Sequence, residues 1–151
     1  MSWWDDIVAG TRAELGSYTF TEDEIIRFAR EYDPQPFHLD EHAAKETLFG
    51  GLAASGWQTM AVTMRLMVDG GLPLAGGIIG AGGEINWPKP TRPGDTLTVV
   101  SEVIEVKPSR SRPDRGMVKV RGETRNQRGE VVQVLIANLL VPRRAPADTA
   151  M

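Results

Sequence analysis

The chain has 151 residues and a formal net charge of −3, which fits one domain with a sizeable core and gives no basic footprint for nucleic acid. Its hydrophobic content of 41% and charged content of 25% are ordinary for a globular protein. Because the sequence contains no cysteine, disulfides, thiolate metal sites and a cysteine nucleophile are excluded.

The amino terminus and the longest uncharged run indicate whether the chain is secreted or spans a membrane. "MSWWDDIVAG" carries two acids where a secretory signal carries basic residues, so we expect a cytoplasmic protein. Residues 47–64 have no charge, but they include three glycines, Ser55 and Gln58. The sequence therefore predicts a buried segment there and no membrane span.

Residues 15–32 predict a strand followed by a helix. "LGSYTF" alternates weakly, as a strand does, and Thr21 with Glu24 three residues later matches a capping box. The helix should end near Asp33, because the residue before Pro34 is pushed out of the helical region. Four apolar residues at helical spacing should face a core: Ile25, Phe28, Ala29 and Tyr32.

A second, largely apolar helix is predicted over "SGWQTMAVTMRLMVDGG". It follows an irregular stretch, residues 33–51, in which "DEHAAKET" allows a short helix. Few charges lie on any face of the second helix, so we expect the rest of the fold to enclose it. Its apolar face would contain Trp57, Met60, Ala61, Met64 and either Met67 or Val68.

Beyond Gly71 the pattern changes to four β-branched stretches: "GGIIGAGGEINWPKP", "DTLTVVSEVIEVK", "MVKVRGETRNQ" and "EVVQVLIANLLVP". The glycines of the first stretch fit neither the dinucleotide nor the Walker spacing, and we expect them to allow close backbone approach to the packed helix. A largely apolar helix followed by four strands predicts an α+β domain, with an antiparallel sheet wrapped around that helix.

Asp33 and His38 are the first candidates for chemistry. They lie five positions apart with Pro34 and Pro36 between them, a spacing that can bring both side chains to one side of a cleft. A carboxylate and an imidazole placed in this way can hold a water for general acid–base catalysis. In the alternative interpretation Asp33 merely ends the helix and His38 is an exposed loop residue.

The second histidine, His42, lies in the acidic stretch "DEHAAK", where a solvated helix face is the simpler interpretation. A metal site would need His38 and His42 together with Asp40 or Glu41, since two histidines four positions apart can share a helix face. "HLDEH" lacks the acid directly after its first histidine, and no third ligand stands out. We therefore predict no metal site.

The stretch "ASGWQ" is a small-residue turn leading into a helix. Such a turn presents unpaired backbone N–H groups and the positive end of the helix dipole. It can stabilise a carbonyl oxygen as that oxygen becomes enolate-like. Simple capping of the helix by Ser55 is the alternative.

Two stretches resemble the MaoC-like dehydratase family, which includes the (R)-specific enoyl-CoA hydratases: "FAREYDPQPFHLDEHAAKETLFGGLAASGWQTMAVTMRLMVD" and "INWPKPTRPGDTLTVVSEV". The resemblance spans about residues 15–142. Its most specific element is an Asp, a spacer ending in proline and an apolar residue, and then a His, directly before the "FGG…ASG" helix entry. On this resemblance we interpret Asp33 and His38 as a catalytic pair.

The resemblance implies a single hot-dog domain, usually paired into a homodimer whose sheets join. It also implies reversible addition of water across the double bond of a trans-2-enoyl-CoA thioester, without a cofactor. Asp33 and His38 would orient the water and move its protons. The backbone N–H of Gly56 would stabilise the thioester oxygen.

The sequence departs from the family at the helix entry. Many members have histidine before the entry glycine, where this chain has Ser55, and some hydratases have a serine at the position of Ala61. Five residues are expected to contact the acyl group or coenzyme A, with packing or solvation as the alternative for each: Phe37, Ser55, Trp57, Gln58 and Arg92. Arg92 is one of several loop cations that can bind phosphates.

Two other activities stay open. A hot-dog thioesterase would direct a carboxylate-activated water at the carbonyl carbon, and a silent hot-dog subunit would bind acyl-CoA without turnover. Asp33 and His38 argue against the silent subunit, which has no chemical reason to retain them. By analogy alone, the single-domain length favours a short or medium acyl group.

Overall fold

An antiparallel sheet of five strands, in the order β1-β3-β4-β5-β2, forms the largest part of the fold. The computed structural model describes residues 1–71 and 73–144. The elements in chain order are η1 (Trp4–Asp6), β1 (Arg12–Thr19), α1 (Glu22–Tyr32), α2 (Pro36–Leu39), α3 (Glu41–Ala44), α4 (Gly56–Gly70), β2 (Ile79–Asn86), β3 (Thr96–Pro108), β4 (Arg115–Arg125) and β5 (Val131–Pro142).

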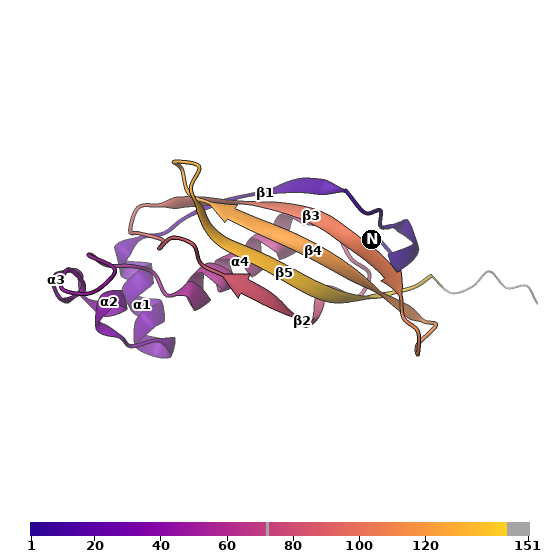
Figure 1. Ribbon diagram of the computed structural model, residues 1–151, viewed down its shortest axis with the longest axis horizontal. Helices are drawn as coiled ribbons and strands as arrows, with labels where there is room; N and C mark the ends of the chain where they lie inside the picture. Colours follow the sequence, from indigo (N-terminus) through magenta and orange to yellow (C-terminus); the bar gives the residue numbers. More distant parts are fainter. Residues whose placement is uncertain (72, 145–151) are drawn as a thin grey trace, which may run out of the picture.

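The helix α4 lies along one face of this sheet, while α1, α2 and α3 gather at one end (Figure 1). Leu66 and Met67 of α4 pack against Leu15, Val99 and Leu135, which come from three different strands. The predicted antiparallel sheet around a long central helix, a hot-dog fold, is therefore confirmed. The four strands predicted after Gly71 are confirmed as β2 to β5.

The alternating burial of residues along β4 shows which face of the sheet is covered. Every second residue of β4 is buried, and the intervening residues are only partly covered. Val118 and Val120 point into the core in this way, beside Leu139 and Val141 of β5. One face of the sheet therefore carries the core, as the alternating pattern predicts.

The strand β2 forms one edge of the sheet and pairs with β5. Gly83 has a φ of +159°, and a Cβ on this residue would lie 2.1 Å from the carbonyl oxygen of Ile136. Glycine is thus required by the backbone of the neighbouring strand. The expectation that the glycines serve approach to the central helix was wrong at Gly83.

The helix α1 begins at the predicted cap residue Thr21, but the capping box is incomplete because the Glu24 carboxylate bonds to Tyr18. Thr21 Oγ1 accepts a hydrogen bond from the Glu24 N–H at 3.2 Å, while the Glu24 carboxylate accepts the Tyr18 hydroxyl at 2.5 Å. Ile25 is fully buried, but Tyr32 is 70% exposed, so its predicted place on the core face was wrong. Tyr32 lies in the last turn of the helix and packs on the ring of Phe28.

The predicted face of α4 was only partly right: Met67 is buried and Met60 packs against the same cluster, but Trp57, Ala61 and Met64 are exposed. Trp57 is 59% exposed and Val68 is 64% exposed, so α4 is not enclosed within the single chain. The face that packs on the sheet contains Gln58, Thr59, Thr63, Leu66 and Met67. Hydrophobicity alone misplaced this face, because three of these five residues are polar and two of them, Thr59 and Thr63, make hydrogen bonds inside the fold.

The uncharged run that leads into α4 is buried between Gly51 and Ser55, as expected. Among the described residues, no helix is long and apolar enough to cross a lipid bilayer.

Candidate active site

Asp33 is placed by the end of α1. Its N–H donates to the carbonyl of Ala29 at 2.8 Å, and its backbone then leaves the helical region with φ −152°. Pro34 follows and prevents the helix from continuing. The Asp33 side chain is only 16% exposed and faces α2.

His38 lies on the short helix α2, which has Pro36 in its first turn. Its ring is buried, with Nδ1 2.6 Å from the carbonyl oxygen of Ala53 and Nε2 3.3 Å from Oδ2 of Asp33. A carbonyl oxygen can only accept a hydrogen bond, so Nδ1 must carry a hydrogen. Nε2 is then the ring nitrogen that can gain or lose a proton. The structure thus joins Asp33 and His38 as predicted, and His38 is not an exposed loop residue.

The Asp33 carboxyl is kept ionised by its neighbours. Burial raises its pKa, but hydrogen bonds from Gln35 and Ser55 and the positive charge of protonated His38 lower it by more. The pKa of Asp33 therefore lies below its ordinary value of 3.8. The pair therefore combines a hydrogen-bonded Nδ1, an Nε2 that can gain or lose a proton, and an ionised carboxylate. This combination suits proton transfer.

The entry of α4 lies beside this pair. Ser55 is the N-cap residue, and its Oγ accepts the N–H of Trp57 at 3.2 Å. The Gly56 N–H belongs to the first turn of the helix, where no intrahelical carbonyl is available. A Cβ on Gly56 would lie 2.5 Å from the indole ring of Trp87, so this position has no room for a side chain.

A polar chain holds Trp87 in place. Its indole N–H donates to Oε1 of Gln133 at 2.9 Å, and Nε2 of Gln133 donates to Oγ1 of Thr63 at 2.9 Å. The Thr63 hydroxyl in turn donates to the carbonyl of Thr59 at 2.8 Å. Gln133 is fully buried. These bonds connect β5 to α4 and fix the ring that covers Gly56.

A cavity of about 310 Å³ lies between α2, the entry of α4 and Trp87. His38 and Gly56 both line it, together with Trp87 on one side and Lys89. The remaining lining residues are Phe49, Ala54, Thr59, Pro88, Pro90, Thr91 and Val132. The His38 imidazole and the N–H end of α4 thus meet in one largely apolar hollow, which is a suitable place for acyl-group chemistry.

Comparison with known proteins identifies the family. Residues 8–126 match the family described as MaoC like domain. The chain belongs to the MaoC-like dehydratase family. The crystal structure of a MaoC-like dehydratase from Rhodospirillum rubrum resembles it with a TM-score of 0.92 and 54% identity, covering 96% of this chain and 99% of that one.

Two relatives extend the comparison within the MaoC-like family. The uncharacterised protein YdeM of Bacillus subtilis is 36% identical over 127 residues, which cover 82% of this chain and 87% of YdeM. A 3-hydroxybutyryl-CoA dehydratase of Methylorubrum extorquens is 29% identical over 148 residues, which cover 97% of this chain and 88% of that protein. Membership of the MaoC-like family supports a hydro-lyase activity in general.

The other residues predicted to bind substrate in this MaoC-like chain lie in different surroundings. Phe37 packs edge-on against the His38 ring at 4.6 Å between centroids, and Trp57 packs edge-on against Trp87 at 5.4 Å. Gln58 is buried and lines a second, larger hollow of about 630 Å³ between α1 and α4. Their contact with substrate stays a prediction.

Arg92 and His42 also have defined places. The Arg92 guanidinium donates to the backbone carbonyls of Phe49, Gly51 and Leu52. His42 is exposed on α3, as its solvated-face interpretation predicts. Within residues 1–71 and 73–144, no group of three or more His, Cys, Asp and Glu side chains is arranged to hold a metal ion.

No sequence pattern pointed to Trp87 or Gln133. Trp87 precedes the prolines of "INWPKP" at the end of a predicted strand, and this is the one local signal that marks it. In the sequence alone, Gln133 is only a polar residue within an apolar strand. Their roles depend on contacts with Gly56 and Thr63, which lie far away along the chain.

We predict that Gln133→Leu lowers the free energy of unfolding by about 1–3 kcal/mol, because it removes the hydrogen bonds that the buried Gln133 amide makes with Trp87 and Thr63. Urea denaturation measures this change. Combining Gln133→Leu with Trp87→Phe removes both partners of the Trp87–Gln133 hydrogen bond and should cost less than the sum of the two single variants. Strict additivity would contradict a direct Trp87–Gln133 interaction.

We predict a pH-dependent effect for Gln35→Ala, which removes a hydrogen bond to Asp33 and raises the pKa of that carboxyl. A carboxyl whose pKa is lowered by folding stabilises the fold above its ordinary pKa, and this contribution is lost as pH falls through the folded value. Gln35→Ala should therefore be less stable than the parent at pH 7, and the difference should narrow below about pH 4.

Urea denaturation across this pH range checks the prediction, with Asp33→Asn as the control background. In that background Gln35→Ala should show no change with pH. If the pH-dependent difference in stability persists without the Asp33 carboxyl, Gln35 does not act through the pKa of Asp33.

Proposed function

We propose that the protein catalyses reversible hydration and dehydration between a trans-2-enoyl-CoA and a 3-hydroxyacyl-CoA. One observation carries the proposal: Nε2 of His38 lies 3.3 Å from Oδ2 of Asp33, and His38 lines the same cavity as Gly56. Acid–base groups and an oxyanion donor are what addition of water to an enoyl thioester requires.

In hydration, Asp33 and His38 orient a water molecule against C3 of the double bond. The water oxygen bonds to C3, its proton passes to the pair, and a proton from the pair adds to C2. The double-bond electrons move toward the thioester carbonyl, and the Gly56 N–H stabilises the charge on its oxygen. Because the two coupled groups share protons, the pair acts as one acid–base unit.

The size of the cavity favours a short acyl group. Its volume of about 310 Å³ lies at the lower end of the range for small-molecule sites. The similarity to a 3-hydroxybutyryl-CoA dehydratase supports a four-carbon acyl group as the first substrate to try. Trp87, held by Gln133, lines this cavity and fills the space beside Gly56.

The two rival activities predict different products. A thioesterase would release free coenzyme A from the thioester, and a silent subunit would bind it without turnover. The anchored Nδ1 of His38 favours hydration, because it leaves Nε2 next to Asp33 for proton exchange.

We predict that the protein consumes the enoyl absorbance of crotonyl-CoA without releasing thiol. Asp33→Asn and His38→Gln should each lower kcat by about 10²–10⁴-fold, since each removes an acid–base group. His42→Gln, which changes an exposed histidine four positions after His38, should keep the parent activity. Circular dichroism establishes that all three variants fold.

Thiol release in a parallel assay would move the assignment to a thioesterase. Unchanged hydration in both folded pair variants would show that Asp33 and His38 are not the catalytic groups. Thioester binding without turnover by the parent protein would favour the silent subunit.

We propose that the protein forms a homodimer through β2. This strand pairs with β5 on one side, and among the described residues its other side has no strand partner. An open edge of this kind presents unpaired N–H and C=O groups to another strand. A second copy presents the same edge, so the two sheets can join.

Light scattering should therefore give a mass twice the chain mass of 16.5 kDa. Ala81 lies in the irregularity between Gly80 and Gly83 and has no register partner on β5. Ala81→Pro should thus weaken the dimer without breaking a bond to β5. A monomeric parent protein would contradict the proposal.

A further inference from the structure

The residues leading into α4 form a strap without regular secondary structure, defined here as residues 49–54, of which residues 51–54 are buried. Its backbone groups are bonded to distant parts of the chain. The Leu52 N–H donates to the Glu41 carboxylate at 2.9 Å, and the Ala53 N–H donates to the carbonyl of Phe37 at 3.0 Å. The strap also contains the Ala53 carbonyl, which fixes the His38 ring, so the position of the strap matters for the active site.

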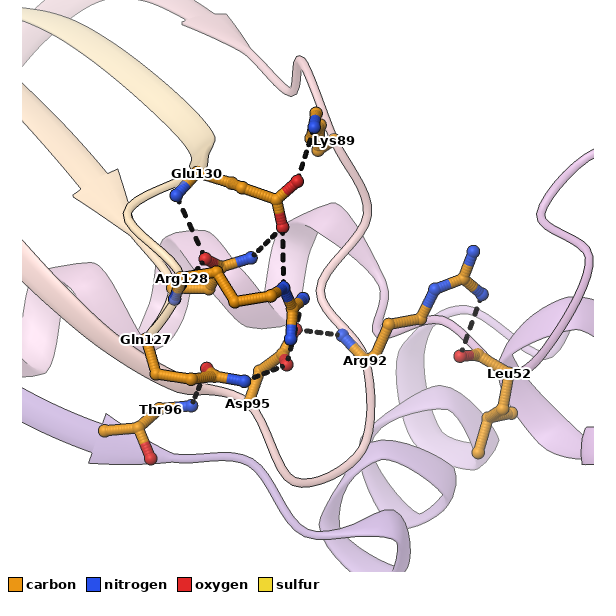
Figure 2. Close-up of polar contacts among 9 residues, drawn as sticks. Leu52, Lys89, Arg92, Asp95, Thr96, Gln127, Arg128 and Glu130 are labelled. Carbon is orange, nitrogen blue, oxygen red and sulfur yellow. Dashed lines mark hydrogen bonds and ion pairs between the residues drawn. The ribbon is translucent and has the colours of Figure 1, made fainter.

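One side chain binds three carbonyls of this strap. The Arg92 guanidinium donates to Gly51 at 2.8 Å, to Leu52 at 3.2 Å, and to Phe49. Figure 2 shows Arg92 reaching from its turn to Leu52. Charge-assisted hydrogen bonds from a rigid planar group fix both the distance and the direction of their acceptors. Arg92 therefore holds the strap at several points at once.

The turn that carries Arg92 is itself anchored. The Arg92 N–H donates to Oδ2 of Asp95 at 2.8 Å, and Oδ1 of Asp95 accepts from Gln127 at 2.9 Å. Asp95 is only 2% exposed, and the Arg128 guanidinium lies 3.6 Å from it (Figure 2). The arginine thus projects from a fixed base that includes the turn between β4 and β5.

We propose that Arg92 is a positioning residue of the active site. Its guanidinium fixes residues 49–52, and through the Ala53 carbonyl that follows them it sets the orientation and tautomer of His38. The effect on catalysis rests on the proposed hydration, whereas the effect on the His38 ring does not. This role is the alternative to phosphate binding by Arg92, which stays a prediction.

The carbonyl of Ala53 is the connecting atom. It lies 2.6 Å from Nδ1 of His38 and follows directly on the last carbonyl that Arg92 binds. If the strap shifts, this acceptor moves, and the hydrogen is no longer confined to Nδ1. A displacement of about 1 Å at a reacting group can lower a rate by about 10²-fold.

The kinetic test uses Arg92→Ala and Arg92→Lys with two substrates, crotonyl-CoA and the crotonyl thioester of N-acetylcysteamine, which has no phosphates. A positioning role predicts that kcat falls by about 10–100-fold with both substrates, while KM changes by less than about threefold. Arg125→Gln is the matched control, because Arg125 pairs with Glu123 on β4 and makes no bond to the strap. A rise in KM confined to crotonyl-CoA would overturn the proposal in favour of phosphate binding.

The spectroscopic test reads His38 directly. The chain has two histidines, so ¹⁵N labelling of histidine gives imidazole signals for His38 and His42 alone. The parent protein should show His38 with its hydrogen on Nδ1, and both Arg92 variants should show averaging toward the pattern of the exposed His42. Unchanged His38 signals in folded variants would overturn the proposal.

The two tests separate this proposal from the proposed function. If the parent protein hydrates no enoyl thioester, the proposed function fails, while the His38 signals still decide the role of Arg92. If Arg92→Ala does not fold, Arg92→Lys decides, since lysine keeps the charge but lacks the planar group that binds three carbonyls.

Discussion

The hydrogen bond between Nδ1 of His38 and the carbonyl of Ala53 connects the fold to the proposed active site. It fixes which nitrogen can exchange a proton, and it does so with a backbone atom rather than with another titrating side chain. The Ala53 carbonyl is held within the strap, which lies between α3 and α4. The chemistry of the imidazole therefore depends on how accurately this irregular segment is placed.

The site is assembled at one end of the sheet, where α1 and the short helices α2 and α3 meet the beginning of α4 (Figure 1). α1 ends at Asp33, α2 carries His38, and α4 contributes the N–H of Gly56. The turn before β3 supplies Arg92 from a different direction. Each element brings one group, so the geometry of the site depends on the contacts between elements.

Polar groups inside the core make some of those contacts. Gln133 is fully buried on β5 and bonds both Trp87 and Thr63 of α4. A buried amide that satisfies two partners selects one arrangement of helix and sheet more sharply than interchangeable apolar contacts do. The same bond fixes the indole ring that leaves no room for a side chain at Gly56. Packing of the core and shape of the cavity are thus set by one polar chain.

Local patterns in the sequence determined α1, α4, the strands and the candidate pair, but not the short helix α2 that carries His38. The cap at Thr21, the stop before Pro34 and the alternation of the strands depend on neighbouring residues, and the sequence predicted them correctly. The tertiary structure alone decided the buried face of α4, the contact of Trp87 with Gly56, and the engagement of Arg92 with the strap. Each of these joins residues far apart in the chain, and the partner of a hydrogen-bonding side chain is fixed only when the packed fold brings one within reach.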